Sequence, residues 1–303
     1  MPRIVVIGSA NIDLTTFTDQ FPRPGETIFG RDFSLGFGGK SANQAVAARL
    51  CGADVAMVAR VGDDMFGEAT IENFKSFGID TSRVLITPGV STGVAPIFVE
   101  SNGQNRILVV KGANDRLTPE DVYAAKDLIL ASNKVVLGLE IPLLTSIKAM
   151  QLAKEHGIQT IFNPAPAQVL DLQEVGLADY VIPNETEAEV LSGMPVRDLE
   201  DARKCIRKLL DGGLSRIIIT LGANGCLFGD QHVASFPVEP VDTTGAGDAF
   251  IGSLAVFLSS GYSELEAISR ANLYAALSTL SIGTQKSFVS KERFNEEWQR
   301  RSK

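Results

Sequence analysis

The chain has 303 residues, of which 45% are hydrophobic and 21% are charged, and its formal net charge is −8. This composition is typical of a folded protein large enough for one large α/β domain or two smaller domains, and it argues against disorder. The negative charge argues against nucleic-acid binding, because affinity for a phosphate backbone requires clustered Lys and Arg.

Short β-branched runs alternate along the chain with stretches of helical periodicity. The β-branched runs predict strands at residues 3–7, 55–61, 135–139, 160–162, 180–182 and 216–220. The periodic stretches predict helices at residues 41–50, 66–77, 119–131, 144–155, 185–191, 199–210, 245–258, 263–280 and 291–300. Alternation of strands and helices favours an α/β fold with a doubly wound, mainly parallel sheet flanked by helices.

Two segments interrupt this alternation. Residues 27–37 and 92–110 have the pattern of antiparallel strands, with a turn at residues 101–104, and no helix connects them to the main sheet. They predict a small separate sheet that serves as a lid or as a dimer contact; the alternative is that they extend one edge of the main sheet. The prediction is a single domain over residues 1–303, with lid segments at about 11–39 and 91–110.

The cysteines and the hydropathy pattern indicate the compartment. Cys51, Cys205 and Cys226 are odd in number and widely separated, which favours reduced thiols over a disulfide framework or a metal site. The apolar run at residues 4–7 is too short for a secretory signal, and no segment approaches the length of a membrane span. We therefore expect a cytoplasmic protein with no membrane partner.

The most informative segment is the run DTTGAGD at residues 242–248, which precedes an apolar helix. Gly245, Ala246 and Gly247 leave the N–H groups of a helix start unobstructed, and such a start favours an anion. Asp248, in the first turn, would place an ionised carboxylate beside that anion, as group transfer requires. The alternative is an ordinary helix cap with a glycine-rich turn, which does not explain the presence of both glycines.

A second cluster, GFGGKSAN at residues 36–43, ends like a phosphate-binding P-loop. The P-loop spacing fails, because it requires glycine at position 34, which is Ser34, and a preceding buried parallel strand. The glycines instead suit the close approach of a small polyhydroxylated ligand, with Lys40 and Asn43 as donors and acceptors.

Further polar residues follow predicted strands. Asn11 and Asp13 follow the first strand, and Glu140 follows the strand at residues 135–139. Ligands of parallel sheets bind at the carboxyl ends of the strands, so we expect these side chains to face the same crevice as Lys40. The alternative for each is a satisfied polar group in a loop.

These segments resemble the signatures of the PfkB sugar kinases, and the ribokinases within them. The resemblance rests on GGKSANQA at residues 38–45, NETE at 184–187 and DTTGAGD at 242–248. It extends over nearly the whole chain through GSANID at 8–13, PGET at 24–27, GDD at 62–64, GAN at 112–114, NPAPA at 163–167 and TLG at 220–222. It implies a ribokinase-like α/β fold with a small β-sheet lid that often forms a homodimer contact.

The resemblance also implies an ATP-dependent transfer of the γ-phosphoryl group to a sugar hydroxyl. Asp248 would accept the hydroxyl proton, while the N–H groups of Gly245, Ala246 and Gly247 stabilise the transferring group. The residues implied to bind the sugar are Asn11, Asp13, Gly39, Lys40, Asn43 and Glu140. Those implied to lie near the phosphates and Mg²⁺ are Asn184 and Glu187, and those beside the nucleotide are Thr220, Gly222, Gly225 and Asn272.

The resemblance further implies a K⁺ site that shapes the anion-binding helix start, formed mostly by backbone carbonyls. Its positions here are Asp242, Thr244, Ser278, Ser281, Gly283 and Ser287. The acceptor that the resemblance favours is the 5-hydroxyl of D-ribose, on the strength of Asn11. Ser41 and the segment at residues 93–99 are closer to deoxyribokinases, so 2-deoxyribose is the second candidate, followed by another sugar or a nucleoside.

The sequence disfavours two functions other than a sugar kinase. A catalytically silent sugar or nucleotide sensor is disfavoured by the intact Gly247 and Asp248. A dinucleotide oxidoreductase requires a Gly-x-Gly-x-x-Gly turn after the first strand, and residues 8–11 do not supply it.

Overall fold

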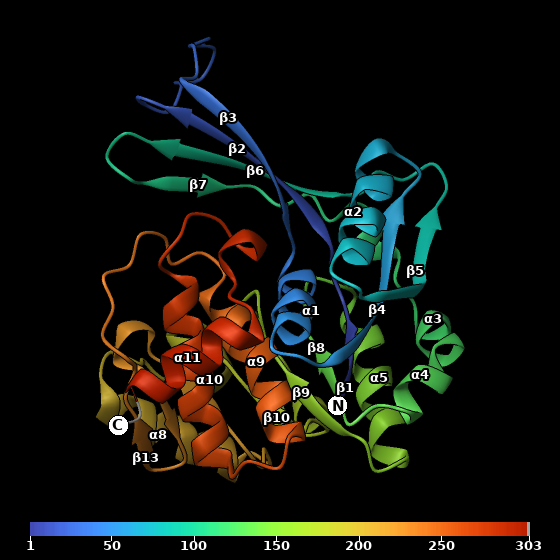
Figure 1. Cartoon of the computed structure of the whole chain (residues 1–303), viewed down its shortest axis with the longest axis vertical. Coiled ribbons are helices and arrows are strands. Elements are labelled where there is room, and N and C mark those ends of the chain that lie inside the picture. The colour runs from blue at the N-terminus through green and yellow to red at the C-terminus, as the bar shows by residue number, and fades with distance from the viewer. Residues whose placement is uncertain (302–303) are drawn as a thin grey trace.

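Six parallel strands form the central sheet of the computed structural model, which describes residues 1–301 (Figure 1). Their spatial order is β10-β9-β8-β1-β4-β5. The strands are β1 (Arg3–Ile7), β4 (Asp54–Gly62), β5 (Asp80–Thr87), β8 (Lys134–Leu137), β9 (Gln159–Phe162) and β10 (Tyr180–Val181). β1 is nearly all buried because helices cover both faces of the sheet, which confirms the predicted doubly wound arrangement.

The two faces of the sheet form two separate cores. Ile4 and Val6 belong to one core and Val5 and Ile7 to the other, as the alternation of a strand requires. The first core is covered by α1 (Lys40–Leu50), α2 (Met65–Ser76), α9 (Ala246–Ser259), α10 (Glu264–Ser278) and α11 (Lys291–Arg301). The second is covered by α3 (Pro119–Ala124), α4 (Lys126–Leu130), α5 (Leu143–Glu155), α6 (Leu172–Val175), α7 (Glu185–Ser192) and α8 (Leu199–Asp211).

A separate four-stranded sheet, hereafter the lid, projects from one end of this body (Figure 1). Its strands, in spatial order, are β3 (Asp32–Gly38), β2 (Asn11–Thr18), β6 (Gly93–Glu100) and β7 (Asn105–Ile107). The prediction of a separate lid sheet is confirmed. Two details were wrong: β2 and β6 pair in parallel along their length, and residues 27–31 lie outside the strand.

A three-stranded antiparallel sheet lies beyond the β10 edge. It consists of β11 (Ile218–Thr220), β12 (Cys226–Phe228) and β13 (Gln231–Val233). Residues 216–220 were expected in the main parallel sheet, and only isolated bridges to Val181 and Asn184 retain that pairing. Pro183 has no N–H and interrupts the parallel pairing between these two bridges, while the short connection after β11 makes β12 its antiparallel partner.

Other differences from the sequence prediction are local. β5 was not predicted, because it is a partly exposed edge strand whose first four residues, DTSR, are polar. The helix expected at residues 119–131 is divided at Ala125 into α3 and α4. Three short 3₁₀ turns complete the structure: η1 (Gly112–Arg116), η2 (Gly222–Asn224) and η3 (Gln285–Ser287). No helix in the described part of the chain is both long enough and apolar enough to cross a membrane.

Candidate active site

Asp248 lies in the first turn of α9, beside a cavity of about 170 Å³. The helix begins after Gly245, whose φ of 78° is a left-handed conformation that favours glycine. The cavity is lined by Gly245 and Gly247 as well as by Asp248, so the predicted helix start and the carboxylate face one space. Asp248 is only 7% exposed, and what remains accessible faces this cavity.

Two amide side chains of α1 hold the Asp248 carboxylate. Asn43 Nδ2 donates to Oδ2 at 3.0 Å, and Gln44 Nε2 donates to Oδ1 at 3.1 Å. Burial raises the pKa of Asp248 above its ordinary value, although the Lys40 ammonium and the Asn43 N–H oppose the shift. A carboxylate with a raised pKa is a better proton acceptor at neutral pH than an exposed one.

Glu140 and Lys40 form the next part of the crevice. Glu140 Oε2 accepts hydrogen bonds from Ser9 Oγ at 2.5 Å and from the backbone N–H of Lys40 at 2.9 Å, just after the α1 cap residue Gly39. Asp248 raises the pKa of the Lys40 ammonium, burial opposes the shift and Glu140 adds to it. Lys40 therefore remains a cation between carboxylates. Ser9 lies in the GSANID segment that carries the resemblance, but it was not among the residues expected to bind the sugar.

Asn11 and Asp13 lie at the start of β2 in the lid, within the segment at about 11–39 that was predicted to form it. Asn11 Oδ1 accepts a hydrogen bond from Asn114 Nδ2 at 2.7 Å, and Asn114 Oδ1 accepts one from the Ala10 N–H at 2.9 Å. Burial, and after it the Glu140 and Asp248 carboxylates, raises the pKa of Asp13 to about 6. Because these carboxylates influence one another, the lid and the body contribute to the same crevice.

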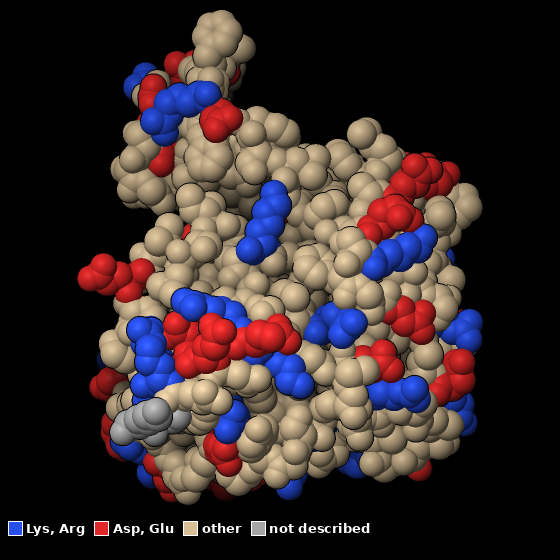
Figure 2. All heavy atoms as spheres, viewed as in Figure 1, with Lys and Arg blue, Asp and Glu red and all other residues tan. Residues whose placement is uncertain are grey.

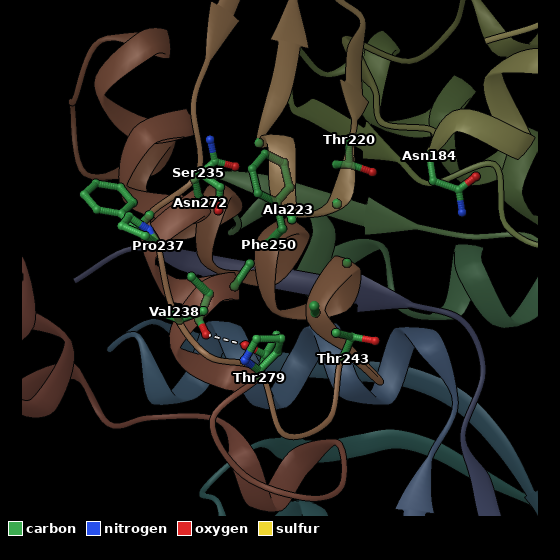
Figure 3. Close-up of a pocket in the computed structure, with 18 of the residues that line it drawn as sticks. Asn184, Thr220, Ala223, Ser235, Pro237, Val238, Thr243, Phe250, Asn272 and Thr279 are labelled. Carbon is green, nitrogen blue, oxygen red and sulfur yellow. Dashed lines mark hydrogen bonds between the residues drawn. The ribbon is translucent and has the colours of Figure 1, made fainter. Parts of the chain in front are cut away.

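A larger cavity of about 400 Å³ adjoins the first one (Figure 3). Asn184, Thr220 and Gly247 line both cavities, so they meet at the start of α9. All four residues predicted beside the nucleotide line the larger cavity: Thr220, Gly222, Gly225 and Asn272. Its walls also include residues that no motif marked: Ser235, Phe236, Pro237, Val238, Pro240, Phe250, Ala275, Ala276 and Thr279.

Asn184 and Glu187 form the capping box of α7. Asn184 Oδ1 accepts from the Glu187 N–H at 2.9 Å, and Glu187 Oε2 accepts from the Asn184 N–H at 2.9 Å. Burial raises the pKa of Glu187, opposed by the Asn184 N–H and then by Lys40. Both residues line the smaller cavity, so a buried carboxylate faces the space next to the helix start.

Of the predicted K⁺ positions, Asp242 and Thr244 precede α9, Ser278 ends α10, and Ser281, Gly283 and Ser287 follow α10. Asp242 joins the loop before α9 to the loop after α10. Asp242 Oδ1 accepts from the Thr244 N–H at 2.9 Å, and Oδ2 accepts from the Gly283 N–H at 2.9 Å. Partial burial raises the pKa of Asp242, but the bonds from Thr244 and Gly283 outweigh it and leave the pKa below its ordinary value. The hydroxyls of Ser278 and Ser287 donate to carbonyls in their own turns, and Ser281 lies between them in the chain.

A buried carboxylate at an open helix start, between a polar crevice and a larger cavity, is the arrangement of a phosphotransferase that brings an acceptor hydroxyl to a nucleoside triphosphate. Comparison with known proteins gives the family. The model of the pfkB family of carbohydrate kinases matches residues 1–291, and the chain belongs to this family. The protein is an ATP-dependent carbohydrate kinase of the ribokinase and deoxyribokinase type.

Three relatives illustrate the similarity. The chain is 47% identical over 299 residues to a deoxyribokinase of Salmonella typhi, covering 97% of each protein. It is 42% identical over 298 residues to a ribokinase of Mus musculus, covering 95% of this chain and 92% of the relative. The fold matches the Arabidopsis thaliana ribokinase complexed with ribose and ATP with a TM-score of 0.90, at 28% identity and 97% and 98% coverage.

Proposed function

We propose that the protein transfers the γ-phosphoryl group of ATP to the 5-hydroxyl of D-ribose, with Asp248 as the general base. The observation that carries this proposal is the position of Asp248, which two α1 amides hold beside the cavity where the start of α9 meets the larger cavity. The sugar occupies the crevice near Asp13, Lys40 and Glu140, with the attacking hydroxyl toward Asp248. ATP occupies the larger cavity, with its γ-phosphate at the backbone N–H groups of residues 245–247.

The same site fits Mg²⁺ bound largely through water. Glu187 supplies one buried carboxylate that faces the smaller cavity, and Asn184 lies beside it. Within residues 1–301 no three His, Cys, Asp or Glu residues come together as a metal site. Mg²⁺ in phosphoryl-transfer enzymes keeps several waters and is held by one or two carboxylates plus phosphate oxygens. When bound, the ion would neutralise charge on the phosphates.

Asn11 favours ribose over 2-deoxyribose as the acceptor. Its Oδ1 is committed to Asn114, which leaves its Nδ2 as the group available to donate to a ligand hydroxyl. Asn11 is buried, and a buried donor that lacks a partner is costly, so a sugar with a 2-hydroxyl is preferred. The 47% identity to a deoxyribokinase makes 2-deoxyribose the second candidate.

An ADP-release assay on D-ribose and 2-deoxyribose tests the acceptor. We expect a higher kcat/KM for D-ribose. The variant Asn11→Met should lower kcat/KM for D-ribose by about 10- to 100-fold, as loss of a buried hydrogen bond predicts, and affect 2-deoxyribose much less. A wild-type preference for 2-deoxyribose would overturn the choice of ribose and leave the kinase chemistry in place.

We also propose activation by K⁺ at the loops that Asp242 joins. The bonds from Asp242 to Thr244 and Gly283 fix these loops beside the start of α9, while the carbonyls of Ser278, Ser281 and Ser287 are candidate ligands. Replacing K⁺ by a large organic cation should lower kcat several-fold, measured by ADP release at constant ionic strength. Equal rates in the two salts would remove this proposal.

A homodimer through the lid is the proposed assembly. Phe33 and Leu35 lie on the same face of lid strand β3 and are 58% and 40% exposed, and Phe29, in the connection before β3, is 99% exposed. Exposed apolar patches of this kind mark interaction surfaces. Figure 2 shows Lys and Arg interspersed with Asp and Glu over the body of the molecule below the lid, which is typical of a solvent-exposed surface.

A further inference from the structure

A chain of three amide side chains ends on the Asp248 carboxylate. Asn73 Nδ2 donates to Gln285 Oε1 at 2.8 Å, and Gln285 Nε2 donates to Asn43 Oδ1 at 3.1 Å. Asn43 Nδ2 then donates to Asp248 Oδ2 at 3.0 Å. The three amides come from α2, η3 and α1, which are far apart in sequence. Gln285 is 5% exposed and Asn43 is 4% exposed, so bulk water competes little for these bonds.

The amide chain has a direction. A carboxamide has an NH₂ group that donates and a carbonyl oxygen that accepts. When a neighbour donates to the carbonyl oxygen, the NH₂ group therefore points to the opposite side. Asn73 fills the acceptor end of Gln285, which turns the NH₂ group of Gln285 toward Asn43. That NH₂ group fills the acceptor end of Asn43, which turns the NH₂ group of Asn43 toward Asp248. An ionised carboxylate only accepts, so this direction is the one that suits Asp248.

We propose that Gln285 and Asn73 are positioning residues for the phosphoryl transfer, because they fix the Asn43 amide with its N–H, and not its carbonyl, against the catalytic carboxylate. Neither residue touches the reacting groups; both act through Asn43. The proposal rests on the proposed role of Asp248 as general base. It also gives a function to α2, which lies outside both cavities described above.

The loop that carries Gln285 is itself anchored to the lid. Thr284 Oγ1 donates to the carbonyl of Phe37, near the end of lid strand β3, at 3.1 Å. Gln285 thus connects the base to a loop that contacts the lid. A second amide of α1, Gln44, donates to the other carboxylate oxygen and does not depend on this chain, so reversal of the chain would change one of two donors.

Reversal of the Asn43 amide would place a carbonyl oxygen against the Asp248 carboxylate. The other charged groups that act on Asp248 are Lys40 on α1, Glu140 after β8, Glu187 on α7 and Asp13 on β2. Lys40 and the Asn43 N–H lower the pKa of Asp248, while burial and Glu140 raise it. Exchanging the N–H for a carbonyl removes one lowering contribution, so the base would protonate at a higher pH.

The variant Asn73→Asp tests this proposal without touching the active site. Above about pH 5 the new carboxylate is ionised and only accepts, so Gln285 must turn its NH₂ group toward position 73 and its carbonyl toward Asn43. Asn43 then turns its carbonyl toward Asp248. We expect the acid limb of the kcat profile to move up by about one pH unit, a tenfold change in the ratio of ionised to protonated base. Asn73→Ala, the matched control, removes a contact without reversing the chain and should shift the limb less.

A double variant shows whether the shift of the acid limb passes through the amide chain or comes directly from the added charge. In a Gln285→Met background the side chain cannot reverse, so adding Asn73→Asp should no longer shift the acid limb. The same shift in both backgrounds, or no shift in Asn73→Asp itself, would overturn the proposal. If the Met background fails to fold, Asn73→Asp is measured at low and high ionic strength with the K⁺ concentration held constant. Screening shrinks a direct effect of the partly exposed charge and leaves a reversed amide chain in place.

The variant Asp248→Asn shows whether the proposed base itself is wrong or only the positioning role of Gln285 and Asn73. If Asp248→Asn retains turnover, the proposed base is wrong. If it is inactive while Asn73→Asp leaves the pH profile unchanged, only the positioning role of Gln285 and Asn73 is wrong.

Discussion

Replacing Asp248 by Asn is expected to lower kcat by about 10²- to 10⁴-fold, the usual contribution of a general base. The amide has nearly the same shape as the carboxylate but cannot accept the hydroxyl proton. Asn43 would still donate to the amide oxygen at position 248, and Gln44, whose Oε1 has no hydrogen-bond partner, can reverse to accept from the new NH₂ group. The fold and the two cavities should therefore persist. ADP release measures kcat, and calorimetric titration measures sugar and nucleotide binding, both of which we expect to remain within a few-fold of wild type.

Asp211→Asn, at the exposed end of α8, is the matched control and should leave kcat unchanged. If Asp248→Asn retained a kcat within tenfold of wild type, Asp248 would not be the base. If the protein were a non-catalytic sensor, the wild-type protein would bind sugar and nucleotide without releasing ADP.

Replacing Gly252 by Ala is expected to lower both stability and activity, although Gly252 lines neither cavity. Gly252 lies one turn after Asp248 on α9, where the backbones of α9 and α1 are in contact. A Cβ at this position would lie 2.3 Å from the Gln44 carbonyl oxygen and 2.8 Å from Ala47 Cβ, so the two helices must separate. We expect the free energy of unfolding to fall by about 1–3 kcal/mol, as overpacking of a core predicts.

The same separation moves the residues that hold the base. Asn43 and Gln44 are on α1 and Asp248 is on α9, and a misplacement of about 1 Å can lower the rate about 10²-fold. Calorimetry gives the Tm, and ADP release below the Tm gives kcat. Gly247→Ala is the control for stability, because its Cβ would meet nothing within 4 Å and should leave the Tm unchanged. Wild-type Tm and kcat in Gly252→Ala would show that the two helices do not need this close contact.

The sequence predicted the fold well where local signals agree with tertiary structure. The apolar run of β1 and the helical periods around it indicated a doubly wound sheet, because buried parallel strands are apolar throughout. The pairing of β2 with β6 was not predictable, because both strands are partly exposed over most of their length, so burial of one face does not define the partner. The antiparallel placement of β11 depends on the turns that follow it, which the apolar pattern of residues 216–220 does not report.

Motifs located many of the residues around both cavities, but not the contacts that orient them. The DTTGAGD and GGKSAN segments have a distinctive composition, since open helix starts require small residues. Ser9 and Asn114 lie in the marked segments GSANID and GAN, and Gln285 lies in none, but the partner of each is fixed only in the fold. Ser9 lies 131 positions from Glu140, Asn114 lies 103 from Asn11, and Gln285 lies 242 from Asn43. Without the tertiary structure, a lone Gln or Asn cannot be distinguished from an ordinary surface residue.

A crystal structure with D-ribose and a non-hydrolysable ATP analogue tests the central claim most directly. The proposed mechanism predicts the sugar 5-hydroxyl about 2.6–3.2 Å from an Asp248 carboxylate oxygen, as a general base requires. The same structure should show the terminal phosphate against the N–H groups of residues 245–247, in line with that hydroxyl. A sugar bound with its 5-hydroxyl turned away from Asp248, or a terminal phosphate remote from the start of α9, would contradict the mechanism.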